Sequence, residues 1–569
     1  MLSSSPRMFT FFALFGLLAV ANAAPLSPRA WYKSTGTPHG SVLPYTTSLG
    51  DRYTVPYAKA PTGSLRFKDP VPIDSFAGSR HFARCRKPRK PRRYDASKLP
   101  PACPQGYDAS AGSEDCLYMT IYAPPAANDF RDLPVFVWLH GGSFFDGSSS
   151  ALDGAALARS QEMIVVTVQY RLGALGWLKS DALGLDGNYG LKDVIQALKV
   201  IQTDISSFGG NPKSVTLAGQ SSGAEIIKSL LVTPSATPLF ARAILQSAPL
   251  DTVDQSPAVA NDVSSVFLSG DYGMVNCDTI SCLQEKNLQD ILLAQGSIRF
   301  WASTRDLVDG AALAEPLRTV IDGSLVTRDF RQVVSSGGQL EGANKEIIFT
   351  TVTDEGCSTI SGLSVSADGT TPPLLNDHTD PAVFPLAVGL AYPDQASSIL
   401  ASGLYDPDTA ANADSVRESL LRLNTDFSWT CPNQQTAVRL TASSGFSKKV
   451  YLGEFDLGVS HDGGSIDFCK NRVDHEDDIA VVFSSPSTHS GAQKTLASEV
   501  QARWGAFAAT GNPTPKPNFG GYSSWPTVSA FTGDLNVLQL GNTSNGKSAI
   551  AKSQRDEQCK VGSGLYVFA

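Results

Sequence analysis

The sequence predicts an α/β protein with a large, mostly parallel central sheet flanked by helices. Two observations support this prediction. Several short runs rich in β-branched residues are apolar without interruption, which is typical of strands that are covered on both faces. Helical patterns stand between some of these runs, and alternating strands and helices favour parallel pairing in one sheet.

Each predicted strand ends in a turn rich in Gly or Ser. The predicted strands lie within residues 133–142, 163–170, 214–220, 242–247, 345–352 and 448–455. The clearest helix is predicted over 190–205, where Leu191, Ile195 and Leu198 recur largely on one side at helical spacing. The irregular stretches from about 250 to 340 and from about 360 to 445 are expected to be insertions or helical caps over the sheet.

The composition is that of a soluble globular protein, since the 569 residues are 42% hydrophobic and 18% charged. The net charge of −8 argues against a nucleic-acid partner. Residues 1–23 are predicted to be a secretory signal peptide, because Arg7 precedes the apolar run 8–20 and small residues follow it. An uncleaved anchor is the alternative. We expect a secreted protein without a membrane span, with residues 24–569 forming a single domain.

The stretch "GQSSG" (219–223) has the pattern G-x-S-x-G and predicts a nucleophilic serine at Ser221. A predicted strand precedes it and a predicted helix over 224–231 follows it. A sharp turn between them would lift the Ser221 hydroxyl into a cleft, and the flanking glycines leave room for that turn. A small-residue turn without chemistry is the alternative for the motif by itself.

The segment "HGGSFFDGS" (140–148) follows a predicted strand and resembles loops that supply oxyanion-binding amides. Consecutive small residues allow several backbone N–H groups to converge on one oxygen. We expect the donors to be the N–H groups of Gly142, Ser143 and Ser222. An ordinary Gly-rich loop between a strand and a helix is the alternative.

An elbow of this type needs an acid and then a histidine further along the chain. Asp354 and Glu355 end a predicted strand, and because adjacent strand side chains point to opposite faces, one of them at most faces the site. His475 lies in a polar turn before an apolar run. The histidines that follow a plausible acid are His378, His461, His475 and His489.

With these motifs the chain resembles the fungal type-B carboxylesterases of the carboxylesterase/cholinesterase family, which have the α/β-hydrolase fold. The resemblance covers about residues 30 to 530 and rests on "SEDCLYMTIYAP" (113–124), the block 187–224, H-x-x-D-I-x-x-V-F from His475, and "WGAFAATGNP" (504–513). It implies that Glu355 is the acid and His475 the base, with His461 as the competing base.

Three residues depart from the family pattern. Gln220 replaces the usual Glu before the nucleophile, Ser222 replaces Ala, and Ser143 replaces the third glycine of the oxyanion loop. Gln220 removes a supporting charge beside the nucleophile. Ser222 keeps its backbone N–H, and Ser143 is expected to narrow the site.

The resemblance implies a carboxylic ester hydrolase that forms an acyl-serine intermediate and needs no cofactor or metal. The 12 residues between Cys103 and Cys116 are few and polar, which favours soluble short-to-medium acyl esters over oil droplets. A triacylglycerol lipase is the alternative, and an inactive cholinesterase-like binding domain is a further one. The ordinary pKa of histidine predicts an acid limb of the pH–rate profile near about 6–7.

Nine cysteines in a chain with a predicted signal peptide indicate disulfides and one remaining thiol. The resemblance implies the pairs Cys103–Cys116 and Cys277–Cys282. Cys431–Cys469 is a weaker proposal, while Cys85, Cys357 and Cys559 are unassigned. Asn542 begins an N-x-S/T sequon and is the predicted glycosylation site. The basic stretch 84–93 is interpreted as a solvated loop or a patch that attracts acidic partners.

Overall fold

The computed structural model describes residues 34–76, 93–128, 132–269, 275–303, 315–337, 340, 345–357, 359–360, 375–376, 379–408, 414–443, 446–459, 467–483, 490–516, 521–529, 535–553 and 555–561. All of them belong to one compact unit, Ser34–Ala569. The predicted signal peptide, nearly all of the basic stretch 84–93, Cys85, and the histidines His378, His461 and His489 lie outside the described residues.

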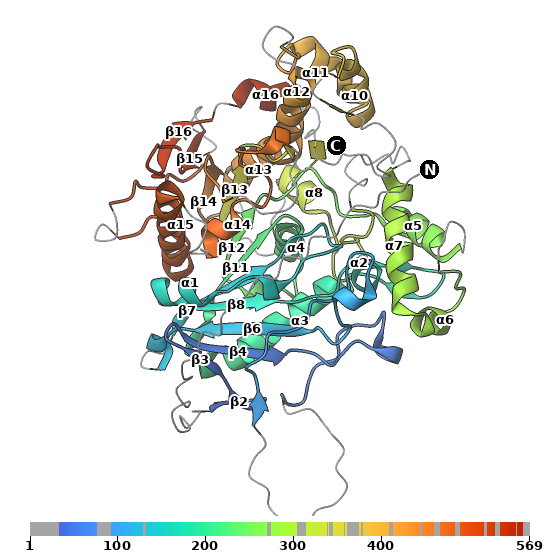
Figure 1. Ribbon diagram of the computed structural model, residues 1–569, viewed down its shortest axis with the longest axis vertical. Coiled ribbons are helices and arrows are strands. Elements are labelled where there is room, and N and C mark those ends of the chain that lie inside the picture. Colours follow the sequence, from blue (N-terminus) through green and yellow to red (C-terminus); the bar gives the residue numbers. More distant parts are fainter. Residues whose placement is uncertain are drawn as a thin grey trace, which may run out of the picture. The chain divides into compact units, whose positions relative to one another are not determined.

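The predicted α/β class and the mostly parallel sheet are confirmed. Within the described residues, eleven strands form one sheet in the order β16-β15-β14-β13-β12-β11-β7-β8-β6-β4-β3. In Figure 1 the colours cross this sheet from blue at β3 and β4 to red at β15 and β16. The mutually parallel strands are β8 (Ile164–Val168), β7 (Leu133–Leu139), β11 (Gly210–Gln220), β12 (Arg242–Gln246), β13 (Glu346–Val352), β14 (Val450–Phe455) and β15 (Asn536–Leu540).

Antiparallel strands extend both edges of this parallel core. They are β6 (Tyr118–Ala123), β4 (Gly50–Pro56) and β3 (Tyr45–Thr47) on one side and β16 (Ala549–Lys552) on the other. Two small sheets lie apart from it. One contains β1 (Thr35–Thr37), β2 (Gly40–Leu43) and β5 (Tyr94–Asp95), and the other contains β9 (Lys179–Ser180) and β10 (Leu185–Asp186).

Alternating side chains of the strands divide the core into two layers. In β7, Val135, Val137 and Leu139 pack in one layer, while Phe136 and Trp138 pack in the other. The first layer includes α3 (Tyr189–Asp204), α4 (Ser222–Leu231) and α13 (Cys431–Ala442). The second includes α1 (Ala155–Gln161), α14 (Ile479–Phe483) and α15 (Gly491–Thr510). Burial on both faces explains the uninterrupted apolar runs of the strands.

The two irregular stretches are helical insertions, as predicted. Between β12 and β13 lie α5 (Pro257–Ser269), α6 (Ile280–Glu285), α7 (Leu288–Ser303) and α8 (Phe330–Ser335). Between β13 and β14 lie α10 (Val383–Ala391), α11 (Ala396–Ser402), α12 (Ser415–Asn424), the π-helix η9 (Thr425–Thr430) and α13. Helices α10 to α12 enclose a third apolar cluster and group together in Figure 1.

Two further short helices are α2 (Gly173–Trp177) and α16 (Asp556–Val561). In the part of the chain that the structure describes, no helix combines the length and apolar character needed to cross a bilayer.

Four disulfides link the described residues. Cys103–Cys116 and Cys277–Cys282 are present as the resemblance implied. The proposed Cys431–Cys469 pair is wrong, because the structure contains Cys357–Cys469 and Cys431–Cys559. Cys357 and Cys469 meet in the third apolar cluster. Cys431 begins α13, against which the C-terminal segment packs, since Gln435 Nε2 donates to the Cys559 carbonyl.

Candidate active site

Ser221 lies on a sharp turn between β11 and α4. Its φ of 54° is unusual for a residue other than glycine, and its N–H donates to the Gln246 carbonyl at 2.9 Å. A Cβ on Gly219 would lie 2.7 Å from the Gly223 carbonyl carbon, and one on Gly223 would lie 2.3 Å from the Leu139 oxygen. Both glycines are therefore required by close backbone approach, and the turn holds Ser221 where β11 ends.

The loop 140–147 follows β7 and lies beside this turn. A Cβ on Gly141 would come within 3.0 Å of the Ser221 Cβ. Gly142 has a φ of 111° and Ser143 one of 53°, so the backbone curls back on itself. Within the described residues, the N–H groups of Gly142, Ser143 and Ser222 donate no hydrogen bond to a carbonyl. The loop that carries two of the predicted oxyanion donors thus lies beside the Ser221 turn, and the third, Ser222, follows Ser221 directly.

The loop closed by Cys103–Cys116 supports the loop 140–147. Gln105 accepts from the Gly147 N–H at 2.9 Å and donates to the Gly147 carbonyl at 3.2 Å. The Tyr107 ring packs edge-on against Phe145, with 5.5 Å between ring centroids. The short disulfide loop therefore clamps the predicted oxyanion loop.

Glu355, and not its neighbour Asp354, faces His475. Glu355 is fully buried; one carboxylate oxygen accepts from the Val352 N–H at 3.0 Å, and the other lies 2.5 Å from His475 Nδ1. Asp354 instead pairs with Arg472 at 3.3 Å and accepts from the Val473 N–H. Asp354 thus joins the two loops, while Glu355 contacts the imidazole of His475.

Burial alone would lower the pKa of His475. The charge of Glu355 and its hydrogen bond, followed by the charges of Glu476 and Asp478, outweigh burial and raise this pKa to about 9. This value lies above the acid limb near about 6–7 that the ordinary histidine pKa predicts, so the pH dependence of kcat/KM distinguishes the two. Asp478 is itself fully buried, and burial raises its pKa to about 7 although Gln246 donates to its carboxylate at 2.6 Å.

Two further side chains contact His475, and sequence reasoning assigned neither of these contacts. Nε2 of Gln220 lies 3.2 Å from Nε2 of His475. The Trp429 ring, carried by the π-helix η9, lies 5.4 Å from the imidazole between centroids, and its Nε1–H donates to the Ser247 carbonyl. The sequence did mark Gln220, because it replaces the usual Glu before the nucleophile. Trp429 lies in an insertion that contains no recognisable motif, so nothing in the sequence marked it.

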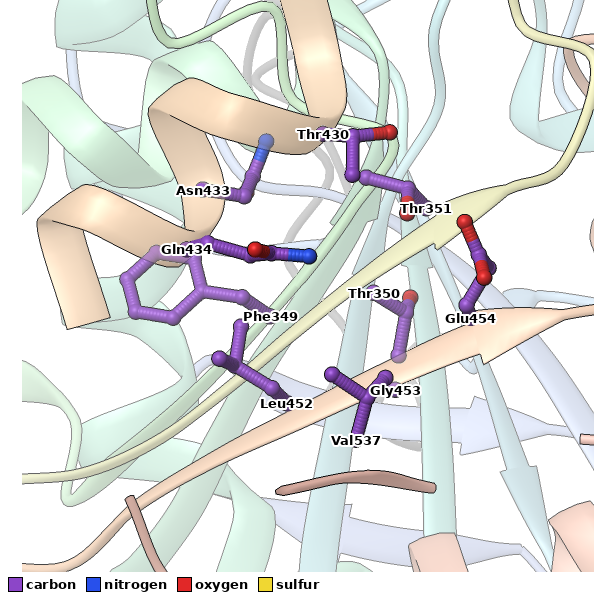
Figure 2. Close-up of a pocket in the computed structure, with 10 residues that line it drawn as sticks. All are labelled: Phe349, Thr350, Thr351, Thr430, Asn433, Gln434, Leu452, Gly453, Glu454 and Val537. Atoms are coloured by element: carbon purple, nitrogen blue, oxygen red, sulfur yellow. The ribbon is translucent and has the colours of Figure 1, made fainter. Parts of the chain in front are cut away.

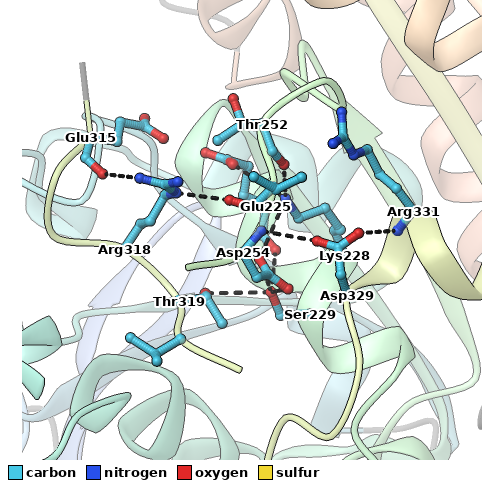
Figure 3. Close-up of polar contacts among 12 residues, drawn as sticks. Glu225, Lys228, Ser229, Thr252, Asp254, Glu315, Arg318, Thr319, Asp329 and Arg331 are labelled. Carbon is cyan, nitrogen blue, oxygen red and sulfur yellow. Dashed lines mark hydrogen bonds and ion pairs between the residues drawn. The ribbon is translucent and has the colours of Figure 1, made fainter. Parts of the chain in front are cut away.

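A buried polar cluster anchors helix α4 behind Ser221 (Figure 3). Lys228 donates to the Thr252 carbonyl at 2.7 Å and lies 3.5 Å from carboxylate oxygens of both Glu225 and Asp254. Asp329 accepts from the Asp254 N–H at 2.9 Å. These contacts fix the first turns of α4, and with them the Ser222 N–H, to the segment that follows β12.

A small pocket lies between α13 and strands β13 and β14 (Figure 2). Its lining includes Thr350, Thr430, Asn433 and Glu454, each of which has a buried side-chain oxygen without a hydrogen-bond partner among the described residues. None of the lining residues is a predicted site residue. The pocket therefore does not define the chemistry of Ser221 and His475.

The fold and this arrangement define an α/β-hydrolase. Among solved structures, a PNB esterase superposes with a TM-score of 0.72 at 25% identity, over 93% of this chain and 100% of that one. Carboxylesterase 1D of Mus musculus is 30% identical over 543 residues, covering 88% of this chain and 86% of that protein. Carboxylesterase 5A of Homo sapiens is 31% identical over 520 residues, covering 86% and 80%.

The model of the carboxylesterase family matches residues 35–561. The chain belongs to the carboxylesterase family and is a carboxylic ester hydrolase. Its substrate is accordingly a small-molecule ester.

Proposed function

We propose that this enzyme hydrolyses esters through a Ser221–His475–Glu355 triad and an acyl-serine intermediate. The observation that carries the proposal is the 2.5 Å hydrogen bond between Glu355 and Nδ1 of His475. The other ring nitrogen, Nε2, contacts Gln220, which is adjacent to Ser221 in the sequence. Nucleophile, acid and base follow one another along the chain in the order typical of this elbow. Each comes from a loop beyond a strand of the parallel core.

In the first step, Ser221 Oγ attacks the ester carbonyl while His475 Nε2 takes its proton. The Nδ1–H of His475 donates to Glu355, whose charge stabilises the imidazolium. The N–H groups of Gly142, Ser143 and Ser222 bind the developing oxyanion, and such donors are each worth about 3 kcal/mol. His475 then protonates the leaving alcohol. In the second step His475 takes a proton from water, which attacks the acyl-serine, and the proton passes to Ser221 Oγ as the carboxylic acid leaves.

For the substrate, we propose dissolved esters of short-to-medium acyl chains. Within the Cys103–Cys116 loop, Tyr107 is the one large apolar residue, and its ring already packs against Phe145. The loop is occupied in supporting residues 140–147 and has little apolar surface for an oil–water interface. A triacylglycerol lipase remains the alternative, with an apolar cover from another segment.

We also propose that the enzyme is secreted, with residues 1–23 removed as a signal peptide and residues 24–569 forming one domain. Four disulfides suit an oxidising compartment. Asn542 is exposed in the turn between β15 and β16, which suits glycosylation. The acidic net charge supports an enzyme without a nucleic-acid partner.

The test is a series of p-nitrophenyl esters of increasing acyl length, followed by tributyrin across its solubility limit. We expect the highest kcat/KM with short-to-medium chains and smooth saturation with tributyrin. A sharp rise in rate when droplets form would support the lipase alternative and contradict the proposed substrate. An absence of hydrolysis with every ester would contradict the triad proposal itself.

A further inference from the structure

The side chain of Gln220 occupies the position beside His475 that matters most for general base catalysis. Gln220 is the last residue of β11 and is fully buried. Its Nε2 lies 3.2 Å from His475 Nε2, the atom that must accept the Ser221 proton. Because Nδ1–H donates to Glu355, Nε2 of the neutral ring carries a lone pair and accepts from the Gln220 amide.

The oxygen end of the Gln220 amide packs against the backbone of Gly141. Its oxygen is buried without a hydrogen-bond partner among the described residues. A Cβ on Gly141 would lie 2.6 Å from that oxygen, so the amide is wedged between the glycine backbone and the imidazole. With the amide in this orientation, a protonated His475 would point its Nε2–H at the N–H group of Gln220, and the two donors would repel each other. A neutral ring instead accepts a hydrogen bond from this N–H group at Nε2.

The carboxylates around the ring favour the protonated form of His475. Glu355 approaches from the loop after β13, and Glu476 and Asp478 belong to the histidine loop itself. A further carboxylate, Asp474, accepts from the backbone N–H of His475 at 2.7 Å. Trp429 on η9 is uncharged. Gln220 is thus the neutral polar side chain at the nitrogen that performs the chemistry.

We propose that Gln220 is a positioning residue that favours the neutral, proton-accepting form of His475 by donating its amide N–H to Nε2. The inference rests on the proposed function, in which His475 is the base. During attack, the Ser221 hydroxyl replaces the amide as the donor to Nε2. A glutamate at this position would instead accept from Nε2–H and stabilise the imidazolium.

The test compares the pH dependence of kcat/KM for wild type, Gln220→Glu and Gln220→Met, with p-nitrophenyl butyrate as substrate. For Gln220→Glu we expect the acid limb to move up by about one unit or more, with activity regained at high pH. For Gln220→Met, which loses the donor without adding charge, we expect a rise of about half a unit. Gln395→Glu, which adds one charge at the partly exposed N-cap of α11, should leave the midpoint unchanged.

A second measurement separates this inference from the proposed function. The resonance of the Nδ1 proton between His475 and Glu355 reports ring titration by NMR without any turnover, and its midpoint should shift as the acid limb does. An unchanged or lowered midpoint in both Gln220 variants would overturn the inference. If wild type hydrolysed no ester while the NMR midpoint still moved, the proposed function would fail and the role of Gln220 would stand. Should Gln220→Glu not fold, the Gln220→Met shift decides alone.

Discussion

The two halves of the active site are held by different kinds of contact. The nucleophile half, Gly219–Gly223 with the loop 140–147, is set by backbone hydrogen bonds and by glycines that touch carbonyl groups. The acid–base half, the loops carrying Glu355 and His475, is set by buried carboxylates, the Asp354–Arg472 ion pair and the Cys357–Cys469 disulfide. Close backbone packing therefore dominates the immediate surroundings of Ser221, with the Lys228 cluster and the Cys103–Cys116 loop as outer supports. Charged side chains dominate the immediate surroundings of His475.

Each half should therefore respond to a different kind of disturbance. Added atoms should damage the nucleophile half, whereas changes of charge or pH should act through the acid–base half. The two halves meet at His475, where Gln220 from the nucleophile half contacts a ring oriented by Glu355. Substitutions in each half test this difference.

The largest effect is expected from removal of the nucleophile. Ser221→Ala should lower kcat by a factor on the order of 10⁶, as loss of a triad serine does in comparable enzymes. Ser222→Ala should keep most of the activity, because its backbone N–H is retained. Ester hydrolysis and labelling by a fluorophosphonate both measure this. If Ser222→Ala were the inactive variant, the assignment of the nucleophile would be wrong.

Glu355→Gln should lower kcat by about 10³–10⁴, since loss of the carboxylate in related triads costs about that much. The sign of its pH effect is also defined. The base must be neutral, so activity is lost as pH falls through the His475 pKa, which Glu355 helps raise to about 9. With this charge removed, burial should move the acid limb to lower pH. Asp354→Asn is the matched control and should cost stability without lowering that midpoint.

Gly223→Ala should reduce kcat/KM by about 10²-fold or more, because small displacements of reacting groups cost this much. The added methyl would lie 2.3 Å from the Leu139 oxygen and 2.5 Å from the His140 oxygen, so the elbow must move. Gly389→Ala on α10 is the control, since a methyl group there would meet no atom of the described residues within 4 Å. The pH midpoint of Gly223→Ala should match wild type, and a shifted midpoint would contradict the division between the halves.

The smallest effect on catalysis is expected for the double variant Cys357→Ser/Cys469→Ser. This bond links residues 112 apart in sequence, and its loss should lower the free energy of unfolding by about 2–4 kcal/mol. Denaturant titration measures the loss. Cys277→Ser/Cys282→Ser, which opens a separation of 5, should cost less. Equal losses in the two double variants would argue against loop length as the cause.

Much of the fold could be predicted from the sequence because each strand is buried on both faces. The run 133–142 became β7 at Leu133–Leu139, and the helix predicted over 190–205 became α3 at Tyr189–Asp204. Ser221 and the loop 140–147 were predicted for a similar reason, since their glycines report local backbone geometry.

Contacts between distant loops could not be predicted in this way. The alternation of strand side chains did not decide whether Asp354 or Glu355 faces the site, and the family resemblance was needed to choose between them. Gln220 and His475 are separated by 255 residues, and Cys357 and Cys469 by 112. No local periodicity reports such pairs, because they depend on how the insertions close over the sheet. The raised pKa of His475 likewise required the positions of Glu355, Glu476 and Asp478.

The support that the Cys103–Cys116 loop gives to the loop 140–147 depends on a covalent bond. Gly147 and Phe145, in the loop that also carries Gly142 and Ser143, contact Gln105 and Tyr107 of a loop whose ends are joined covalently. A newly made chain that still carries both thiols has this support untethered. We therefore expect ester hydrolysis to fall when the Cys103–Cys116 bond is reduced, because the loop 140–147 then loses a covalently closed support.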